Sequence, residues 1–293
     1  MRIGTVTINK MACTHAALGF LLAMSAAAGS AQELRLQDLE GQIVFSSNRS
    51  GPWRIWIIEA SSSDARQLTE DGDSNVHDAD PVFSPDGATV LFSSTRGASA
   101  GIWTVSAKGG NPTRLCDGDQ AEWSPDGAQI ALRRNNRLWV RELSSGAERA
   151  LVPEDGSFYS GPAWAPDGKT IAFAARSGGA NAIYLIPADG GTPSKLYDKK
   201  GACEPHFSRD GQLIVYETET NICTIQPDGQ KNRMVTYQGG VQRYGRGSPD
   251  GKYVVYCQGS SEQGPWELYV VPIKGGVPVK LTGGSSDMNP DWR

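Results

Sequence analysis

Short apolar runs alternate with glycine-rich turns along most of the chain. Runs of three to six β-branched, aromatic and leucine residues, such as Val90–Phe92 and Ile102–Val105, are bounded by turn-forming residues. Runs of this length and composition predict short β-strands. After residue 31 no stretch sustains the 3.6-residue period of an amphipathic helix, so the pattern predicts an all-β chain.

One turn phrase returns with a period of about forty residues. The phrase Ser-Pro-Asp-Gly, or a close variant, places its aspartate at Asp86, Asp126, Asp167, Asp210 and Asp250. Two apolar runs and then a turn with a third short run follow each copy, which indicates the four strands of a propeller blade. We interpret the aspartates as turn formers, because Pro presets φ, Asp bonds to nearby backbone and Gly accepts positive φ.

The two ends of the chain supply parts of the same blade. Residues 42–69 contain three strand patterns but lack the opening strand that precedes each Ser-Pro-Asp-Gly turn, and residues 289–293 have the pattern of that missing strand. We therefore predict an all-β fold, a six-bladed β-propeller of four-stranded antiparallel blades over residues 42–293. The C-terminal strand closes the ring by completing the N-terminal blade, which leaves only short outer edges.

The first thirty-one residues have the pattern of a signal peptide. Arg2 and Lys10 precede an uncharged stretch with an apolar core at 16–24 and small residues at 25–31. This order predicts export and cleavage after Ala31, because the apolar core is shorter than a membrane span. A retained membrane anchor is the alternative. We expect a signal peptide at 1–31, a short N-terminal segment at 32–41, and a periplasmic or secreted product.

Composition narrows the classes of partner. The chain has 28 Lys and Arg against 32 Asp and Glu, a net charge of −4, which gives no electrostatic footprint for nucleic acid or an anionic membrane. We expect no nucleic acid, no membrane span after cleavage, and a monomer. Export permits disulfides, but the remaining cysteines allow three pairings, and free thiols stay open. They are Cys116, Cys203, Cys223 and Cys257.

A closed ring brings equivalent residues of each blade to one end of a central channel. The loops between blades share one face of the ring, here called the interblade-loop face, and the Pro-Asp-Gly turns share the opposite turn face. The residues one position before the Pro of each opening strand are Asp80, Gln120, Gly161, Glu204, Tyr244 and Asn289. We predict a binding surface at this mouth, made of His77, Asp78, Asp80, Tyr159, Glu204, His206, Arg243, Tyr244, Arg246, Asp287 and Asn289. Ordinary loop hydration is the alternative.

The sequence offers no catalytic constellation and only an incomplete metal motif. Asp71, Asp73 and Asn75 match the opening of an EF-hand loop, but its glycine at the sixth position and glutamate at the twelfth are missing. We therefore assign no catalytic residue and no cofactor. A calcium ion in this loop or in the channel is left open.

The repeats resemble a known propeller family. The phrase Phe45–Arg49, the triplet Gln67–Thr69 and the Pro-x-Trp-Ser-Pro-Asp-Gly turns resemble the WD-repeat-like propeller of the TolB family, the periplasmic component of the Tol-Pal system. The similarity covers residues 42–293. The family carries a further N-terminal α/β domain, whereas about ten residues separate the predicted cleavage site from the first strand here. We therefore expect a TolB-like propeller without that domain.

This resemblance implies binding of protein partners at one mouth of the channel. Our first hypothesis is a non-catalytic exported propeller that binds a protein or an envelope polymer through the interblade-loop face. The alternative is a metal-dependent propeller enzyme, of lyase or lactonase type, acting on a small molecule or a polysaccharide. A fold by itself does not choose between them.

Overall fold

The computed structural model describes residues 33–70, 73–97, 99–152, 157–177, 180–199, 201–237 and 239–293. The predicted signal peptide and Asp71 lie outside these ranges. By internal contacts the chain divides into residues 1–33 and residues 34–293, and the description below concerns the second unit. Among the described residues, no helix is long and apolar enough to cross a membrane.

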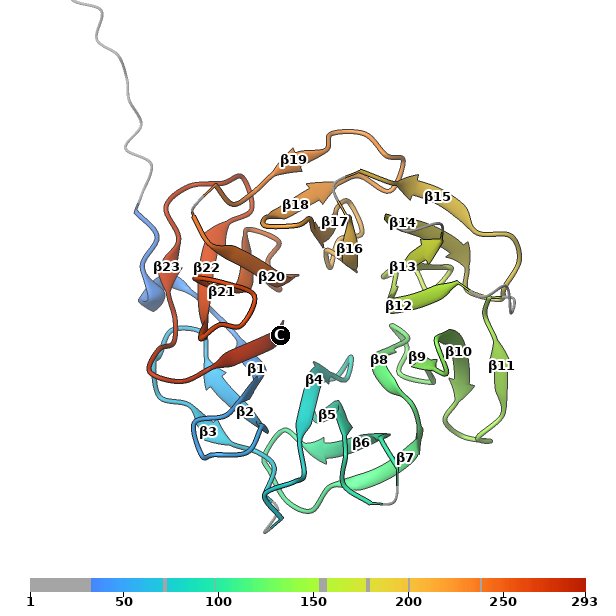
Figure 1. Ribbon diagram of the computed structural model, residues 1–293, viewed down its shortest axis with the longest axis horizontal. Helices are drawn as coiled ribbons and strands as arrows, with labels where there is room; N and C mark the ends of the chain where they lie inside the picture. The colour runs from blue at the N-terminus through green and yellow to red at the C-terminus, as the bar shows by residue number, and fades with distance from the viewer. Residues whose placement is uncertain are drawn as a thin grey trace, which may run out of the picture. The chain divides into compact units, whose positions relative to one another are not determined.

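The described strands form six four-stranded antiparallel sheets around a ring, as Figure 1 shows. The first sheet has the order β24 (Asp287–Trp292), β1 (Gln42–Ser47), β2 (Arg54–Glu59), β3 (Arg66–Gln67), and a short 3-10 helix, η1 (Leu36–Asp38), precedes it. The second comprises β4 (Asp78–Phe83), β5 (Thr89–Ser94), β6 (Gly101–Ser106) and β7 (Thr113–Asp117). The third comprises β8 (Asp119–Trp123), β9 (Gln129–Arg134), β10 (Arg137–Glu142) and β11 (Glu148–Ala150).

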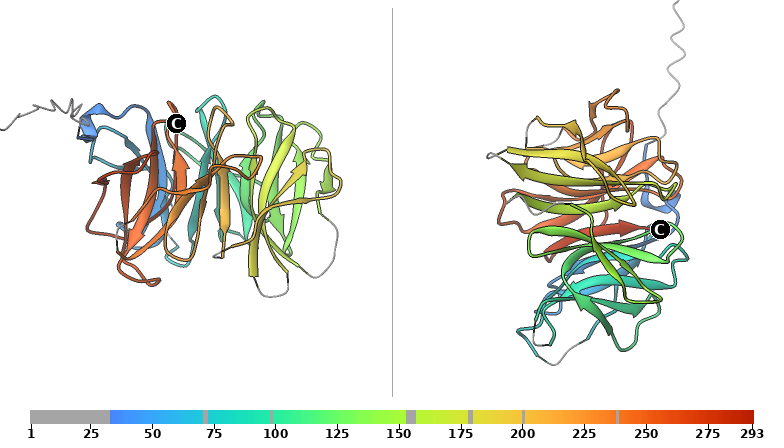
Figure 2. Two further views of the ribbon diagram at one scale, coloured as in Figure 1. Left: turned by 90° about the horizontal axis from the view of Figure 1, so that it is seen from above. Right: turned by 90° about the vertical axis from the view of Figure 1, so that its right-hand side faces the viewer.

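The remaining three sheets repeat this order along the chain. The fourth comprises β12 (Phe158–Trp164), β13 (Thr170–Ser177), β14 (Ala180–Pro187) and β15 (Ser194–Tyr197). The fifth comprises β16 (Cys203–Phe207), β17 (Ile214–Glu217), β18 (Ile222–Ile225) and β19 (Arg233–Met234). The sixth comprises β20 (Val241–Gly247), β21 (Tyr253–Gly259), β22 (Trp266–Pro272) and β23 (Val279–Lys280). Figure 2 shows the ring from two further sides. The predicted six-bladed all-β propeller is confirmed.

The ring closes through the last strand of the chain. β24 pairs antiparallel with β1, with Ile43 opposite Trp292 and Ser47 opposite Asp287. The Arg293 N–H donates to the Gln42 carbonyl at 2.8 Å, which extends the ladder beyond the strand. Trp292 is 3 % exposed and packs with residues of β1, β21 and β22. The C-terminal strand therefore completes the N-terminal blade, as the sequence pattern predicts.

The repeated aspartates hold the turns. In the second blade, the Ser84 hydroxyl donates to Asp86 Oδ1 at 2.5 Å and the Ala88 N–H donates to the same oxygen at 2.9 Å. The following Gly87 has φ of 74°. These two hydrogen bonds lower the pKa of Asp86. The carboxylate is therefore occupied within its own turn.

Hydrophobic contacts between neighbouring blades make the core. One cluster joins Ile43 and Trp292 of the first sheet to Val255 and Leu268 of the sixth. Another joins Leu138 of the third sheet to residues of the fourth sheet. Each blade thus buries its apolar side chains against the next one, so the closed ring needs no separate capping element.

The four cysteines of the described chain are free thiols. Three of them are buried, and burial raises the pKa of Cys257 well above its ordinary value. A buried neutral thiol behaves as a small apolar residue. The three buried cysteines, Cys116, Cys223 and Cys257, therefore contribute to the hydrophobic clusters of the core.

Candidate binding site in the propeller channel

One residue in the opening strand of each blade has a left-handed backbone conformation. We call these six residues the channel ring: Asp80, Gln120, Gly161, Glu204, Tyr244 and Asn289, whose φ angles lie between 46° and 56°. In every blade the pairing between the opening strand and the second strand shifts register at this point, as in a β-bulge. A bulge redirects a side chain, and all six residues line one cavity in the channel.

Hydrogen bonds from the preceding blade hold part of the channel ring in place. The Gln120 N–H donates to Ser93 Oγ at 3.1 Å, and the Tyr244 N–H donates to Glu217 Oε2 at 2.9 Å. Ser93 and Glu217 occupy equivalent positions on β5 and β17. A left-handed conformation costs roughly 1–3 kcal/mol for a residue other than glycine, and such strain gathers at functional sites. The fold thus maintains strained residues where they face the channel.

Gly161 leaves the channel ring open on one side. A Cβ atom at this position would lie 3.0 Å from Glu204 Oε2. The Gly161 N–H donates to Gln120 Oε1 at 3.4 Å. A side chain here would therefore crowd the carboxylate of Glu204, which the glycine leaves accessible from the channel.

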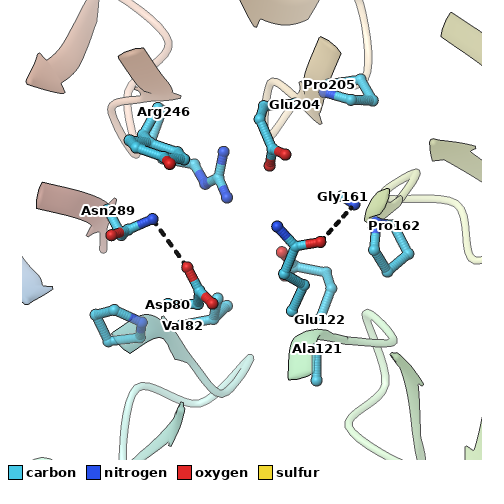
Figure 3. Close-up of a pocket in the computed structure, with 13 residues that line it drawn as sticks. Asp80, Val82, Ala121, Glu122, Gly161, Pro162, Glu204, Pro205, Arg246 and Asn289 are labelled. Carbon is cyan, nitrogen blue, oxygen red and sulfur yellow. Dashed lines mark hydrogen bonds between the residues drawn. The ribbon is translucent and has the colours of Figure 1, made fainter. Parts of the chain in front are cut away.

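Two carboxylates of the channel ring are partly desolvated. Figure 3 shows Asp80, Glu204 and Arg246 pointing into a common space, with Asn289 bonded to Asp80. Asn289 Nδ2 donates to Asp80 Oδ1 at 2.8 Å. Burial, together with the nearby Glu217, raises the pKa of Glu204 to about 7, while Arg246 opposes the shift. Burial likewise raises the pKa of Asp80.

Arg246 is the cation of this cavity. Its Nε is buried without a hydrogen-bond partner, and its Nη1 donates to the Gly245 carbonyl at 3.4 Å. The cavity has a volume of about 30 Å³, enough for about one water molecule. The carboxylates accept hydrogen bonds and Arg246 donates them, so the cavity suits the tip of a polar group.

The channel widens toward the turn face. A second cavity of about 240 Å³ lies there, and Glu122 lines both cavities. His206 Nε2 lies 3.5 Å from Glu122 Oε2. Burial lowers the pKa of Arg293, and the neighbouring Arg209 lowers it further. Three carboxylates and one arginine line the narrow end of the channel, so that end is predominantly acidic. The turn end carries the basic side chains of Arg209 and Arg293.

The structure brings together five residues of the predicted binding surface. They line the narrow cavity and are Asp80, Glu204, Tyr244, Arg246 and Asn289. Arg243 does not line this cavity, and its Nε lies 3.8 Å from Glu217 Oε1. His206 lines the cavity at the turn end instead.

The other four predicted residues do not line either cavity. Asp78 is fully buried and pairs with Arg96, and Asp287 is fully buried and pairs with Arg49 at 2.9 Å. Tyr159 is buried in the contact between two blades, and the remaining residue, His77, is exposed. The two aspartates thus tie each opening strand to the adjacent hairpin of its own blade.

The acidic loop at Asp73 is organised by its own hydrogen bonds. Asp73 Oδ1 accepts the N–H of Asn75 at 2.8 Å and its Nδ2 at 2.9 Å. In the residues that the structure describes, no group of three His, Cys, Asp or Glu side chains is arranged to hold a metal ion. Asp71, the first residue of the motif, lies outside them.

Glu217 is the residue of this site that sequence reasoning missed. It is 5 % exposed, and its Oε2 accepts the hydrogen bond from the Tyr244 N–H that holds this part of the channel ring. The available signal was a glutamate directly after the apolar run Ile214–Tyr216, where a strand would bury it. A buried carboxylate needs a partner, and that partner is the backbone of the next blade.

Two curated proteins are similar to this chain in sequence. Uncharacterized protein Atu1656 of Agrobacterium fabrum is 24% identical over 241 residues, which cover 72% of this chain and 80% of that protein. Uncharacterized peptidase YuxL of Bacillus subtilis is 26% identical over 184 residues, which cover 57% of this chain and 26% of that protein. The chain therefore spans only about a quarter of the Bacillus relative.

Solved structures and family models extend this likeness. TolB from Acinetobacter baumannii matches with a TM-score of 0.73 at 19% identity, over 86% of this chain and 66% of that one, which shows a shared fold. The family model described as the TolB beta propeller domain matches residues 38–137 and 120–293. Since these matches span all six blades, the chain belongs to the TolB beta propeller domain family.

Proposed function

We propose that this chain is an exported binding protein whose channel receives a polar segment of a protein partner in the cell envelope. The partner enters from the interblade-loop face, where the opening strands begin and the channel ring is reached first. Membership of the TolB propeller family and the signal-like N-terminal pattern support this proposal.

The observation that carries the proposal is the arrangement of polar groups in the narrow cavity. Asp80 and Glu204 face Arg246 there, and Arg246 Nε is buried without a partner. Burial of a carboxylate costs free energy, and a ligand that donates hydrogen bonds to Asp80 and Glu204 recovers part of that cost. The strained backbone of the channel ring holds these groups in position before any ligand arrives.

The chemistry favours a donor-rich group on the partner. Two carboxylates against one guanidinium attract an amine or a guanidinium, such as a lysine or arginine side chain. The cavity of about 30 Å³ admits only the tip of such a group, so most of the contact area would come from the surrounding interblade loops. A folded protein supplies such a surface, and we therefore favour it over an envelope polymer.

The test is capture from an envelope extract of the source organism with the whole protein immobilised. The channel variant is Glu204→Gln with Asn289→Ala. The matched control is Glu219→Gln, because Glu219 is exposed and lies outside the cavity. We expect one protein to be recovered at least tenfold above background with wild type and the control, and at least fivefold less with the channel variant. Equal recovery with the channel variant would refute the proposed site.

The pH dependence of capture sharpens the test. With the pKa of Glu204 at about 7, its ionised fraction rises about tenfold between pH 6 and pH 8. A cationic partner group should therefore bind more tightly at pH 8, and Glu204→Gln should remove most of this dependence. Tighter binding at pH 6 would instead indicate an anionic or neutral partner group.

A further inference from the structure

The wider cavity at the turn end of the channel is lined by the last residue of every opening strand. In each sheet this residue pairs with the second strand at an equivalent register position, as Phe83 does with Val90. The cavity has a volume of about 240 Å³, and we call it the turn-end cavity. The six equivalent residues that line it are Phe83, Trp123, Trp164, Phe207, Gly247 and Trp292. Five sheets therefore contribute an aromatic ring to its wall, and the sixth sheet contributes a glycine.

Gly247 leaves a gap in this wall. Among the described residues, a Cβ atom at Gly247 would meet a single atom within 4 Å, the Cα of Ser208 at 3.9 Å. At other seams the aromatic residue packs on the preceding sheet, since Trp292 shares a hydrophobic cluster with Val255 and Phe83 shares one with Val44. The fifth sheet thus has open space at the place where the repeat would put an aromatic ring.

Two arginines beside the gap also depart from the repeat. Arg209 stands where the other complete turns have Pro, and Arg293 stands where they have Ser or Ala. Both line the turn-end cavity together with Gly247. Departures from a locally consistent pattern are expected at functional sites. Three of them meet here in one cavity.

The two guanidinium groups lack an anionic partner. Arg209 is exposed and Arg293 is half-buried, and no ion pair or side-chain hydrogen bond holds either group within the part of the chain that the structure describes. Burial and the charge of Arg209 lower the pKa of Arg293, and Asp86 and Asp291 offset only part of this lowering. An anion between the two arginines would relieve their repulsion.

The carboxylates of the turn-end cavity are already engaged. Asp291 Oδ2 accepts the N–H of Phe83 at 2.9 Å, and Glu122 Oε2 lies 3.5 Å from His206 Nε2. Arginine donates paired hydrogen bonds to a carboxylate, which makes it the usual partner for such an anion. The gap and the arginines therefore ask for a ring and a carboxylate in one ligand.

We propose that the turn-end cavity binds an aromatic carboxylate, with its ring in the gap at Gly247 and its carboxylate between Arg209 and Arg293. The ring takes the place that an aromatic side chain has in the other five sheets. Ligand pockets commonly measure about 300–1,000 Å³, so this smaller cavity suits a ligand with one ring. Such a group occurs as a free small acid or as the aromatic residue at the carboxyl end of a polypeptide.

This site is distinct from the narrow cavity that carries the proposed function. The two cavities share Val82 and Glu122, whereas Gly247, Arg209 and Arg293 line the turn-end cavity alone. Variants at Arg209 leave Glu204 and Asn289 in place. The two proposals can therefore fail or succeed independently in the experiments.

The test is calorimetric titration of the whole protein with N-acetylphenylalanine. We expect saturable one-to-one binding with a dissociation constant of about 1 mM or tighter. N-acetylphenylalaninamide lacks the negative charge and N-acetylglycine lacks the ring, so each should bind at least tenfold more weakly. A tripeptide, N-acetyl-Ala-Ala-Phe, separates the two sources. Binding at least fivefold tighter than that of N-acetylphenylalanine assigns the end of a polypeptide, and equal or weaker binding assigns a free acid.

Two variants and a control place the ligand in the cavity. Arg209→Gln changes an exposed side chain and should weaken binding about fivefold or more, the effect of losing roughly one charged hydrogen bond. Gly247→Phe fills the gap and should abolish binding while the melting temperature stays equal or rises. Lys252→Gln removes an exposed cation of the neighbouring turn, outside the cavity, and should leave binding unchanged.

Four results would overturn the proposal. They are absence of saturation up to about 10 mM ligand, equal affinity for the amide, unchanged binding by Arg209→Gln, and unchanged binding by a folded Gly247→Phe variant. If Gly247→Phe does not fold, the amide and Arg209→Gln decide the outcome.

Discussion

Two equivalent places in the ring differ in what surrounds them. One is the groove between the sixth and first sheets, which residues 34–40 cover and which we call the covered groove. The other is a hollow of about 730 Å³ between the third and fourth sheets. In the covered groove, chain connectivity removes the Pro-Asp-Gly turn between Arg293 and Gln42, and residues 34–40 fill the space. Between the third and fourth sheets, the turn at Asp167 is present and lines the hollow. The comparison teaches that a repeated blade sets the shape of a groove, whereas sequence outside the repeat decides what occupies it.

The largest expected effect comes from removing the closing strand. Deleting residues 289–293 takes most of β24 away from β1 and removes the buried Trp292. We expect a loss on the order of 5 kcal/mol or more in the free energy of unfolding, because a buried Trp alone is worth about 3–5 kcal/mol. Thermal unfolding followed by circular dichroism measures it. An unchanged melting temperature would contradict closure of the ring by this strand.

The second prediction concerns the segment that covers the groove. Leu39→Ala should lower the free energy of unfolding by about 2–3 kcal/mol, because it removes a buried leucine side chain. Urea denaturation measures this loss. Gln37→Ala, at an exposed position of the same segment, is the control and should change stability by less than about 0.5 kcal/mol. Equal effects of the two changes would mean that the segment does not cover the groove.

The third prediction concerns how the free energy of unfolding depends on pH, which Glu204 in the channel should affect and Leu39 in the covered groove should not. Burial raises the pKa of Glu204 to about 7, so between about pH 4.5 and 7 the folded state holds more protons than the unfolded state. This group therefore lowers stability as pH rises through that window. Glu204→Gln should be more stable than wild type by about 1–2 kcal/mol at pH 8 and nearly equal to it below pH 5.

Matched variants make this pH test specific. The exposed Glu219→Gln should show no such pH-dependent difference, and the loss caused by Leu39→Ala should be alike at pH 5 and pH 8, because its contacts are uncharged. Urea denaturation at both pH values measures all three variants. A Glu204→Gln variant that is less stable than wild type at pH 8 would show that the carboxylate is well compensated in the channel.

The smallest effect compares the two indoles directly. Trp292→Phe loses the hydrogen bond to the Glu40 carbonyl and should cost about 1 kcal/mol more than Trp164→Phe, whose indole has no partner to lose. Both changes remove the same atoms from buried positions, so the difference isolates the hydrogen bond. A larger loss at Trp164 would indicate that its N–H is already satisfied in solution.

Part of the candidate site was predictable because repeats align. The position before the Pro of each opening strand identifies Asp80, Glu204 and Asn289 as equivalent, and all three line the channel cavity. The same reasoning placed Asp78 and Asp287 at the mouth, two residues earlier, where a regular strand would show them on the same side. The left-handed ring residues interrupt that alternation, and the two aspartates instead pair with Arg96 and Arg49.

The sequence by itself determined the number of blades, the strands within them and the closure of the ring. These features depend on local turn chemistry and on a period of about forty residues, both readable along the chain. Only the tertiary structure decided the electrostatics of the channel and the packing of residues 34–40 over the groove between the sixth and first sheets. The pKa of Glu204 depends on burial and on Glu217, Asp80 and Arg246. These groups come from three sheets, and their distances are fixed only when the ring is closed.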